Sequence, residues 1–179
     1  MRSMPIDLVA VERHLVSNDA VSVLLRGHLW VETALTDLIS VGLEYPEHWQ
    51  ELQRLSFPSK VGLARAQGEL PWPGALIELN RTRNKVGHDP RFEVDHSAAL
   101  HLAASFEPDF GHLEEAGDMG ASPELRGDET PADIVRACVL VLITHLLVLT
   151  TEALQAQTNT VTEQRRRARE MLVAREADD

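Results

Sequence analysis

The stretch "TPADIVRACVLVLITHLLVLTTEAL", residues Thr130–Leu154, decides the fold class of this chain. It is apolar on every side and rich in β-branched residues, so a buried strand competes with a helix as its interpretation. Length decides between them, because about 25 residues without Gly or Pro are too many for a strand and suit a central helix. Thr130, Pro131 and Asp133 supply an N-cap, a Pro at the first helical position and an acid in the first turn. A helix that is apolar all round must be covered by neighbouring helices or by a second copy of the chain.

Helical patterns also dominate the rest of the chain, and aromatic residues make up only 4% of its 179 residues, which leaves little material for a sheet. We therefore predict an all-α fold, an up-and-down helical bundle with a long central C-terminal helix. Caps, Pro and Gly residues set the expected helix boundaries. The predicted helices are Pro5–Val16, a long second helix from the caps Ser17-Asn18-Asp19 to about Leu43, Pro46–Leu55, Pro58–Gly68, about Gly74–Val86 and His96–Phe106.

Charge is distributed unevenly along the chain, whose formal net charge is -11. The segment between Glu107 and Thr130 contains eight carboxylates and one arginine, and it is rich in Gly and Pro. This composition predicts an acidic surface loop over residues 107–129. Between Trp72 and Phe92, in contrast, four cations face two carboxylates, a net charge of +2. The balance argues against broad, non-specific adhesion to nucleic acid but allows a local positive site.

Cys138 is the only cysteine and lies in the apolar "RACVLVLITHLL" stretch, so we expect a small buried hydrophobe and not a reactive thiol. One cysteine without an apolar N-terminal segment indicates a reducing, cytoplasmic location. The apolar run 137–149 is interrupted by Thr144 and His145 and is shorter than the roughly 20 residues that a membrane span needs, so no membrane segment is expected.

Two polar residues, His28 and Glu32, interrupt the apolar stripe of the predicted second helix. The stripe follows alternating steps of four and three residues: Val21, Leu25, His28, Glu32, Leu35 and Ile39. His28 and Glu32 either form a satisfied buried pair, His with Glu or Glu with a cation, or line a functional site. His145 is favoured as a core or interface histidine, whereas His14, His48, His101 and His112 have no organised neighbours. Because motifs for zinc hydrolases, P-loops and serine hydrolases are absent from the sequence, no metal or cofactor is expected.

The stretch "ELNRTRNKVGHDP", residues 78–90, concentrates cations, an amide and an imidazole at the end of a predicted helix. Gly87 is a natural left-handed residue after a helix, and Pro90 disfavours helical geometry just before it, so we expect the helix to end near Val86. His88 would then fold back towards Arg83, and both could face one cleft.

An R-x4-H spacing is weak evidence by itself, and Arg91 and His96 form a second such pair. Glu93 and Asp95 lie between the members of that second pair and would repel an anionic ligand. Only the first pair is retained as a candidate site.

"LNRTRNKVGH", with Asn84 directly after Arg83, resembles the R-x4-6-H signature of HEPN domains, which are all-α bundles. The upstream "LLRGHLWVETALTDLI", residues 24–39, is similar to the long second helix of these domains and carries Glu32 in a comparable setting. The chain resembles mannitol-operon-repressor-like members in particular. The resemblance predicts a HEPN-like domain over residues 1–157, with the loop 107–129 inserted and a charged helical tail over 158–179.

The resemblance implies a metal-independent endoribonuclease that uses the 2′-OH of RNA as nucleophile, in a toxin or antiviral setting with a cognate antitoxin or other regulatory partner. His88 would act as general base or acid, Arg83 would bind the phosphate and Asn84 would orient either group. Supporting or substrate-binding roles would fall to Glu32, His28, Arg81 and Lys85. A homodimer would complete a composite cleft and bury the apolar last helix.

A non-catalytic HEPN-like regulator or adaptor, acting through protein–protein contacts, is the alternative. In that arrangement Arg83 would form a buried ion pair with Glu32, and His88 would cap its helix. The acidic composition favours this alternative, whereas the presence of Arg83, Asn84 and His88 together favours the ribonuclease.

Overall fold

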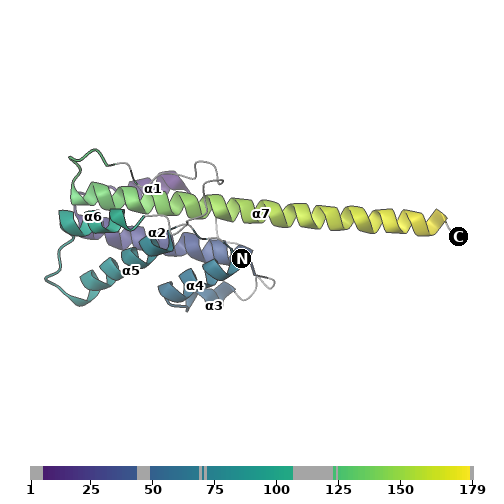
Figure 1. Cartoon of the computed structure of the whole chain (residues 1–179), viewed down its shortest axis with the longest axis horizontal. Helices are drawn as coiled ribbons and strands as arrows, with labels where there is room; N and C mark the ends of the chain where they lie inside the picture. Colours follow the sequence, from purple (N-terminus) through teal and green to yellow (C-terminus); the bar gives the residue numbers. More distant parts are fainter. Residues whose placement is uncertain are drawn as a thin grey trace.

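The computed structural model describes residues 6–43, 49–68, 70, 72–106, 123 and 125–177, and all regular secondary structure in these ranges is helical. The all-α prediction is therefore confirmed. Most of the predicted acidic loop 107–129 lies outside the described residues. The helices, labelled in Figure 1, are α1 Leu8–His14, α2 Ala20–Val41, α3 Trp49–Gln53, α4 Phe57–Gln67, α5 Pro73–His88, α6 His96–Ala104 and α7 Pro131–Ala177.

Helices α2 and α7 lie side by side, run in the same direction and form the centre of the molecule. Arg136, near the start of α7, donates from Nη2 to the carbonyl of Ser17 at 2.7 Å, just before α2 begins. Gln157 donates to the carbonyl of Val41, where α2 ends. α7 continues without a break to Ala177, so its C-terminal half projects beyond the other helices (Figure 1).

Side-chain caps explain where the main helices begin. Asp19 accepts hydrogen bonds from the N–H groups of Val21 at 3.2 Å and Ser22 at 3.0 Å. At the start of α7, Thr130 Oγ1 accepts from Asp133 N at 3.3 Å, and Asp133 Oδ2 accepts from Thr130 N at 3.2 Å, a reciprocal capping box. The predicted starts of both helices are confirmed.

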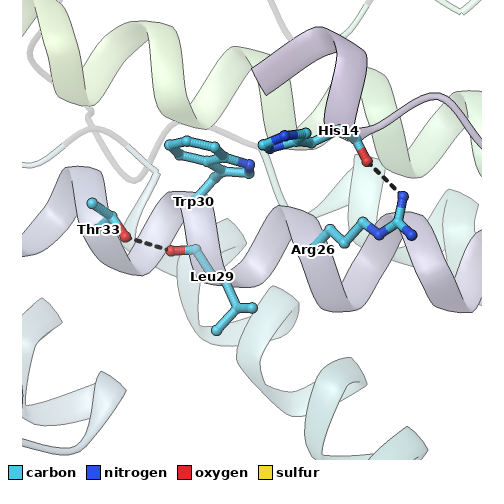
Figure 2. A pocket seen from close by; sticks show the side chains of 5 residues that line it. All are labelled: His14, Arg26, Leu29, Trp30 and Thr33. Atoms are coloured by element: carbon cyan, nitrogen blue, oxygen red, sulfur yellow. Dashed lines mark hydrogen bonds between the residues drawn. The ribbon is translucent and has the colours of Figure 1, made fainter. Parts of the chain in front are cut away.

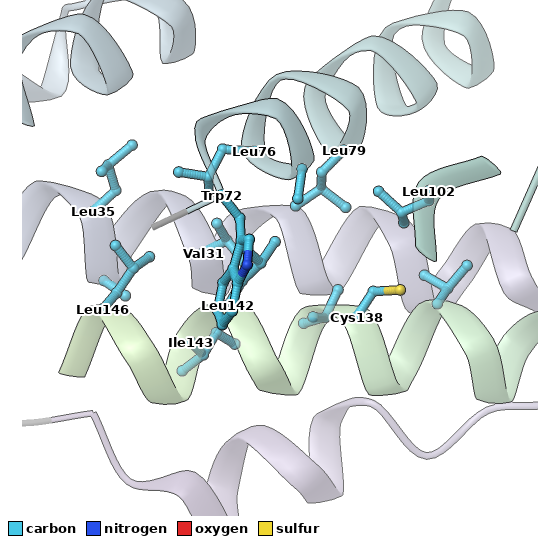
Figure 3. Close-up of a cluster of buried hydrophobic side chains, with 14 of the residues drawn as sticks. Val31, Leu35, Trp72, Leu76, Leu79, Leu102, Cys138, Leu142, Ile143 and Leu146 are labelled. Atoms are coloured by element: carbon cyan, nitrogen blue, oxygen red, sulfur yellow. The ribbon is translucent and has the colours of Figure 1, made fainter. Parts of the chain in front are cut away.

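The hydrophobic core lies where α2, α5, α6 and α7 meet (Figure 3). α2 contributes Val31 and Leu35, and α7 contributes Cys138 and Leu142. Trp72, just before α5, packs its ring against the same cluster. Cys138 is fully buried, as predicted, and burial raises the pKa of its thiol to about 12, which keeps it protonated and unreactive.

α7 is long and apolar enough within Pro131–Arg167 to cross a membrane, with a mean hydropathy of 2.2 over an 18-residue window. Length and composition alone do not separate such a span from the core helix of a bundle. Here one face of α7 forms the core, through residues such as Val139, Leu142 and Leu146.

α5 ends later than predicted. Gly87 and His88 are helical, and Asp89, with φ -123° and ψ 104°, is the C-cap, whose N–H donates to Lys85 O at 2.8 Å. The expected end near Val86 is therefore wrong. Pro90 stops the helix by forcing Asp89 into extended geometry, while Gly87 is tolerated in the last turn without adopting a left-handed conformation. α1 also begins later than predicted, at Leu8, because Asp7 is its cap.

Gly27 lets α2 pass very close to α7. A Cβ added at Gly27 would lie 2.5 and 2.9 Å from the two methyl carbons of Val139, which is fully buried. We therefore expect Gly27→Val to lower the free energy of unfolding by about 1–3 kcal/mol, because overpacking outweighs the better helix propensity. Urea unfolding followed by circular dichroism measures the change.

Gly62 in α4 is the matched control, because a Cβ added there would meet nothing within 4 Å. Gly62→Val should leave the unfolding midpoint near that of the wild type. Equal midpoints for the two variants would contradict close packing at Gly27.

Candidate functional site

The three predicted catalytic residues lie on the C-terminal half of α5. Arg83 and His88 are exposed and Asn84 is half-buried. Arg83 donates from Nη1 to Asn84 Oδ1 at 3.1 Å, so the guanidinium is oriented by its neighbour. Because the helix continues through His88, the imidazole lies about 140° around the axis from Arg83. The expected folding back of His88 towards Arg83 is therefore wrong.

Arg83 and His88 instead flank a narrow stripe on α5. Helical spacing places Asn80, Asn84 and Gly87 in this stripe, with Arg83 on one side and His88 on the other. A Cβ added at Gly87 would meet nothing within 4 Å, so the surface between the two groups is open. The arrangement leaves room for a ligand to contact the helix between a guanidinium and an imidazole.

Arg81 and Lys85 share the side of α5 that carries His88, since the three residues are spaced i, i+4 and i+7. Arg81 Nη1 lies 3.4 Å from Glu78 Oε2, but the Arg81 side chain remains 67% exposed. Lys85 Nζ lies 5.5 Å from the centroid of the Phe92 ring. The exposed end of α5 is therefore positively charged in an otherwise acidic chain.

Glu32 forms its ion pair with Lys60 and not with Arg83. The distance between Lys60 Nζ and Glu32 Oε1 is 2.6 Å, and Lys60 is only 2% exposed. Within the described ranges, Arg83 forms no ion pair, so the predicted Arg83–Glu32 pair is wrong. The pairing of Glu32 with a cation was one of the two interpretations of this residue, and it is confirmed with Lys60 as the cation, although Glu32 itself is half-buried.

Sequence reasoning missed Lys60 and Asn80. Lys60 follows Phe57 by three residues and precedes Ala64 by four, and all three are buried. A lysine on the apolar stripe of the predicted helix 58–68 was therefore the available signal, of the same kind as His28 and Glu32. Asn80 carried no such signal, because its partner comes from another helix.

His28 is buried between α2, α4 and α5. Its Nε2 lies 3.2 Å from Asn80 Oδ1, and because a carboxamide oxygen accepts, the imidazole donates from Nε2. Its ring centroid lies 4.6 Å from that of Phe57, and its Nδ1 lies 4.0 Å from Glu32 Oε2. Burial lowers the pKa of His28, while the Asn80 hydrogen bond and Glu32 act in the opposite direction. His28 is therefore neutral at pH 7.

These residues form a polar cluster, which we define as His28, Glu32, Lys60 and Asn80. The positive charge of Arg83 contributes to lowering the pKa of His28, so the cluster and the exposed guanidinium interact electrostatically. The polar cluster fixes the orientation of α5 relative to α2 and α4, and thereby positions Arg83 and Asn84.

His145 and His101 also have structural neighbours, so the expectation of none for His101 is wrong, while His48 and His112 lie outside the described residues. His145 is half-buried, with its ring centroid 4.3 Å from that of Trp72 and its Nδ1 2.9 Å from the carbonyl of Val141, in keeping with a packing role. His101 Nε2 lies 3.7 Å from Glu78 Oε1. In the described part of the chain, no three His, Cys, Asp or Glu residues come together as a metal site.

A pocket of about 470 Å³ lies away from these residues, between α1 and α2 (Figure 2). His14 stacks on Trp30 with 5.6 Å between ring centroids, and Arg26 Nη1 donates to the His14 carbonyl at 3.0 Å. The expectation that His14 has no organised neighbour is therefore wrong. Leu29 and Thr33 complete the lining, so none of the predicted site residues belongs to this pocket.

Comparisons with protein-family models, with curated proteins and with solved structures find no match to this chain.

Proposed function

We propose that this chain is a metal-independent endoribonuclease of HEPN type, with Arg83, Asn84 and His88 at its site. The observation that carries the proposal is the open surface at Gly87, flanked by the exposed Arg83 and His88. A guanidinium that is free of carboxylates among the described residues suits a phosphodiester, because its fixed fork of N–H donors matches two non-bridging oxygens.

The reaction requires proton transfer and charge stabilisation. The 2′-oxygen of RNA attacks the adjacent phosphorus, the bond from phosphorus to the 5′-oxygen breaks, and a 2′,3′-cyclic phosphate and a 5′-hydroxyl end result. His88 would remove the proton from the 2′-OH or deliver one to the leaving oxygen. Arg83, held by Asn84, would stabilise the negative charge on the phosphorane. Arg81 and Lys85 would bind neighbouring phosphates. The polar cluster, which includes His28 and Glu32, would hold α5 in place against α2 and α4.

A second copy of the chain completes the site in this proposal. The angle of about 140° between Arg83 and His88 makes joint contact with one phosphate difficult within a single chain. A two-fold axis near the end of α5 would bring Arg83 of one copy towards His88 of the other. The proposed setting is a cytoplasmic toxin or antiviral protein with a neutralising partner.

RNA cleavage in excess EDTA tests the proposed activity. Purified wild-type protein should convert tRNA or mRNA into fragments with 2′,3′-cyclic phosphate ends, and Arg83→Ala and His88→Ala should each remove this activity. Circular dichroism should show that both variants stay folded, because both side chains are exposed. Lys85→Ala, which removes a flanking cation, should weaken RNA binding and leave the end chemistry unchanged.

A non-catalytic regulator or adaptor of HEPN type is the second candidate. The separation of Arg83 from His88 around α5 favours it, because neither group then supports the other within one chain. Intact RNA with the folded wild type, at protein concentrations where a second copy is bound, would reject the ribonuclease in favour of this candidate.

A further inference from the structure

The face of α7 that points away from the bundle carries a heptad repeat. Leucine or valine recurs every seven residues, and a threonine follows each of the three leucines by four residues. We call this set the α7 stripe: Leu140, Thr144, Leu147, Thr151, Leu154, Thr158 and Val161.

The α7 stripe is open to solvent on the projecting half of the helix, whereas Leu140 and Leu147 are partly buried against the core. Leu154 is 42% exposed and Val161 is 46% exposed, whereas the core residues Val139 and Leu142, on the other side of α7, are buried. A hollow of about 470 Å³ on the same face is lined in part by Leu154 and Thr158. The stripe therefore begins on the bundle and continues onto the projecting half of the helix (Figure 1).

The threonines of the stripe make it more apolar than the sequence suggests. Thr151 Oγ1 donates to Leu147 O at 2.8 Å, and Thr158 Oγ1 donates to Leu154 O at 2.9 Å. Because these hydroxyls are satisfied by the helix's own carbonyls, the side chains can offer their methyl groups to a partner.

Charges avoid the stripe. The flanks of the stripe are the positions one and three residues after each of its leucines and its valine. Between Thr144 and Gln164 the carboxylates are Glu152 and Glu163, and both lie outside the stripe and outside these flanks. On the projecting half, Glu163 pairs with Arg166 at 2.8 Å and with Arg167 at 3.0 Å, on the side opposite the stripe. A helix face that contacts only solvent usually carries charged residues, so about six turns without charge indicate a face that contacts a partner.

We propose that the α7 stripe is a self-association surface, on which the α7 helices of two copies pack antiparallel around Leu154. The 3.5-residue repeat is typical of helices that pair along their length, and a second α7 supplies a partner of equal length with the same repeat. Uncharged flanks, including Gln155, Gln157 and Gln164, create no repulsion between copies.

The position of Arg165 favours antiparallel packing. Arg165 lies seven residues after Thr158, at the heptad position that threonine occupies earlier in the stripe. A parallel pair would place the two Arg165 guanidinium groups side by side, whereas an antiparallel pair separates them. Antiparallel packing also lays the projecting half of each copy over Leu140 and Leu147 of the other. The contact uses α7 and not α5, so it stands independently of the proposed ribonuclease.

Light scattering during size exclusion tests the surface. The wild type should show at least twice the chain mass of 19.9 kDa, and Leu154→Glu should lower the mass of the assembly at least two-fold. Thr160→Glu is the matched control, since Thr160 is exposed on the projecting half but outside the stripe, and it should keep the mass of the wild type. A wild type that is a monomer, or a Leu154→Glu variant that keeps the mass of the wild type, would overturn the proposal. So would a monomeric wild type that co-sediments with phosphatidylcholine vesicles, which would assign the stripe to a membrane.

Disulfide formation tests the direction of packing. The native Cys138 is buried and should give no cross-link. Leu154→Cys should form a covalent dimer under mild oxidation, and Arg165→Cys should not, because antiparallel helices centred on Leu154 hold the two positions about 33 Å apart. Efficient cross-linking through position 165 would overturn the antiparallel arrangement.

Discussion

Arg83→Ala chains mixed with His88→Ala chains should regain about a quarter of the wild-type rate of RNA cleavage when the site is shared across a two-fold axis. Each variant alone should be slower than the wild type by about 10²- to 10⁴-fold, the usual effect of losing a general acid or base, as for His88, or a group that stabilises transition-state charge, as for Arg83. In an equal mixture half of the dimers are mixed, and each mixed dimer carries one intact site of two. The rate of release of 2′,3′-cyclic phosphate ends measures the recovery.

The control for recovery is the double variant Arg83→Ala/His88→Ala mixed with His88→Ala. No dimer in that mixture holds both wild-type groups in one site, so its rate should stay at the level of the variants. If the two single variants form mixed dimers and cleavage does not return, the site is not composite. The proposal of a site shared at α5 would then fail, while the separate contact through α7 would be unaffected.

Glu32→Ala should lower the free energy of unfolding by about 3–5 kcal/mol, because it leaves the Lys60 ammonium buried without its carboxylate. Lys60 is 2% exposed, and its Nζ lies 2.6 Å from Glu32 Oε1. Urea unfolding, followed by circular dichroism at 222 nm, measures the loss.

Two comparison variants make this interpretation specific. Glu32→Ala/Lys60→Met should recover much of the lost stability, since removing both charges of a buried pair is far less costly than removing one. Glu163→Ala breaks exposed ion pairs on α7 and should change the unfolding midpoint little. A double variant no more stable than Glu32→Ala would show that packing around Glu32, and not the uncompensated charge, governs stability.

Local signals in the sequence were sufficient to predict a helix boundary where a single interaction between residues close in the chain fixes that boundary. Asp19 caps α2 through the next turn, and Thr130 with Asp133 caps α7, so both starts could be predicted. The class of the fold followed from the length of the apolar run after Thr130. The end of α5 was missed because two local signals competed there, and the restriction imposed by Pro90 prevailed over the preference of Gly87.

The candidate site divides in the same way. Sequence patterns were enough to place Arg83, Asn84 and His88 near one helix end, and to show that His28 and Glu32 interrupt an apolar stripe. The packing of the helices was needed to establish that Glu32 binds Lys60, that His28 binds Asn80 and that Arg83 stays exposed. Those partners are 28 and 52 residues apart in the chain, and which cation or amide meets a buried polar group depends on how α2, α4 and α5 pack, a long-range outcome that no local pattern encodes.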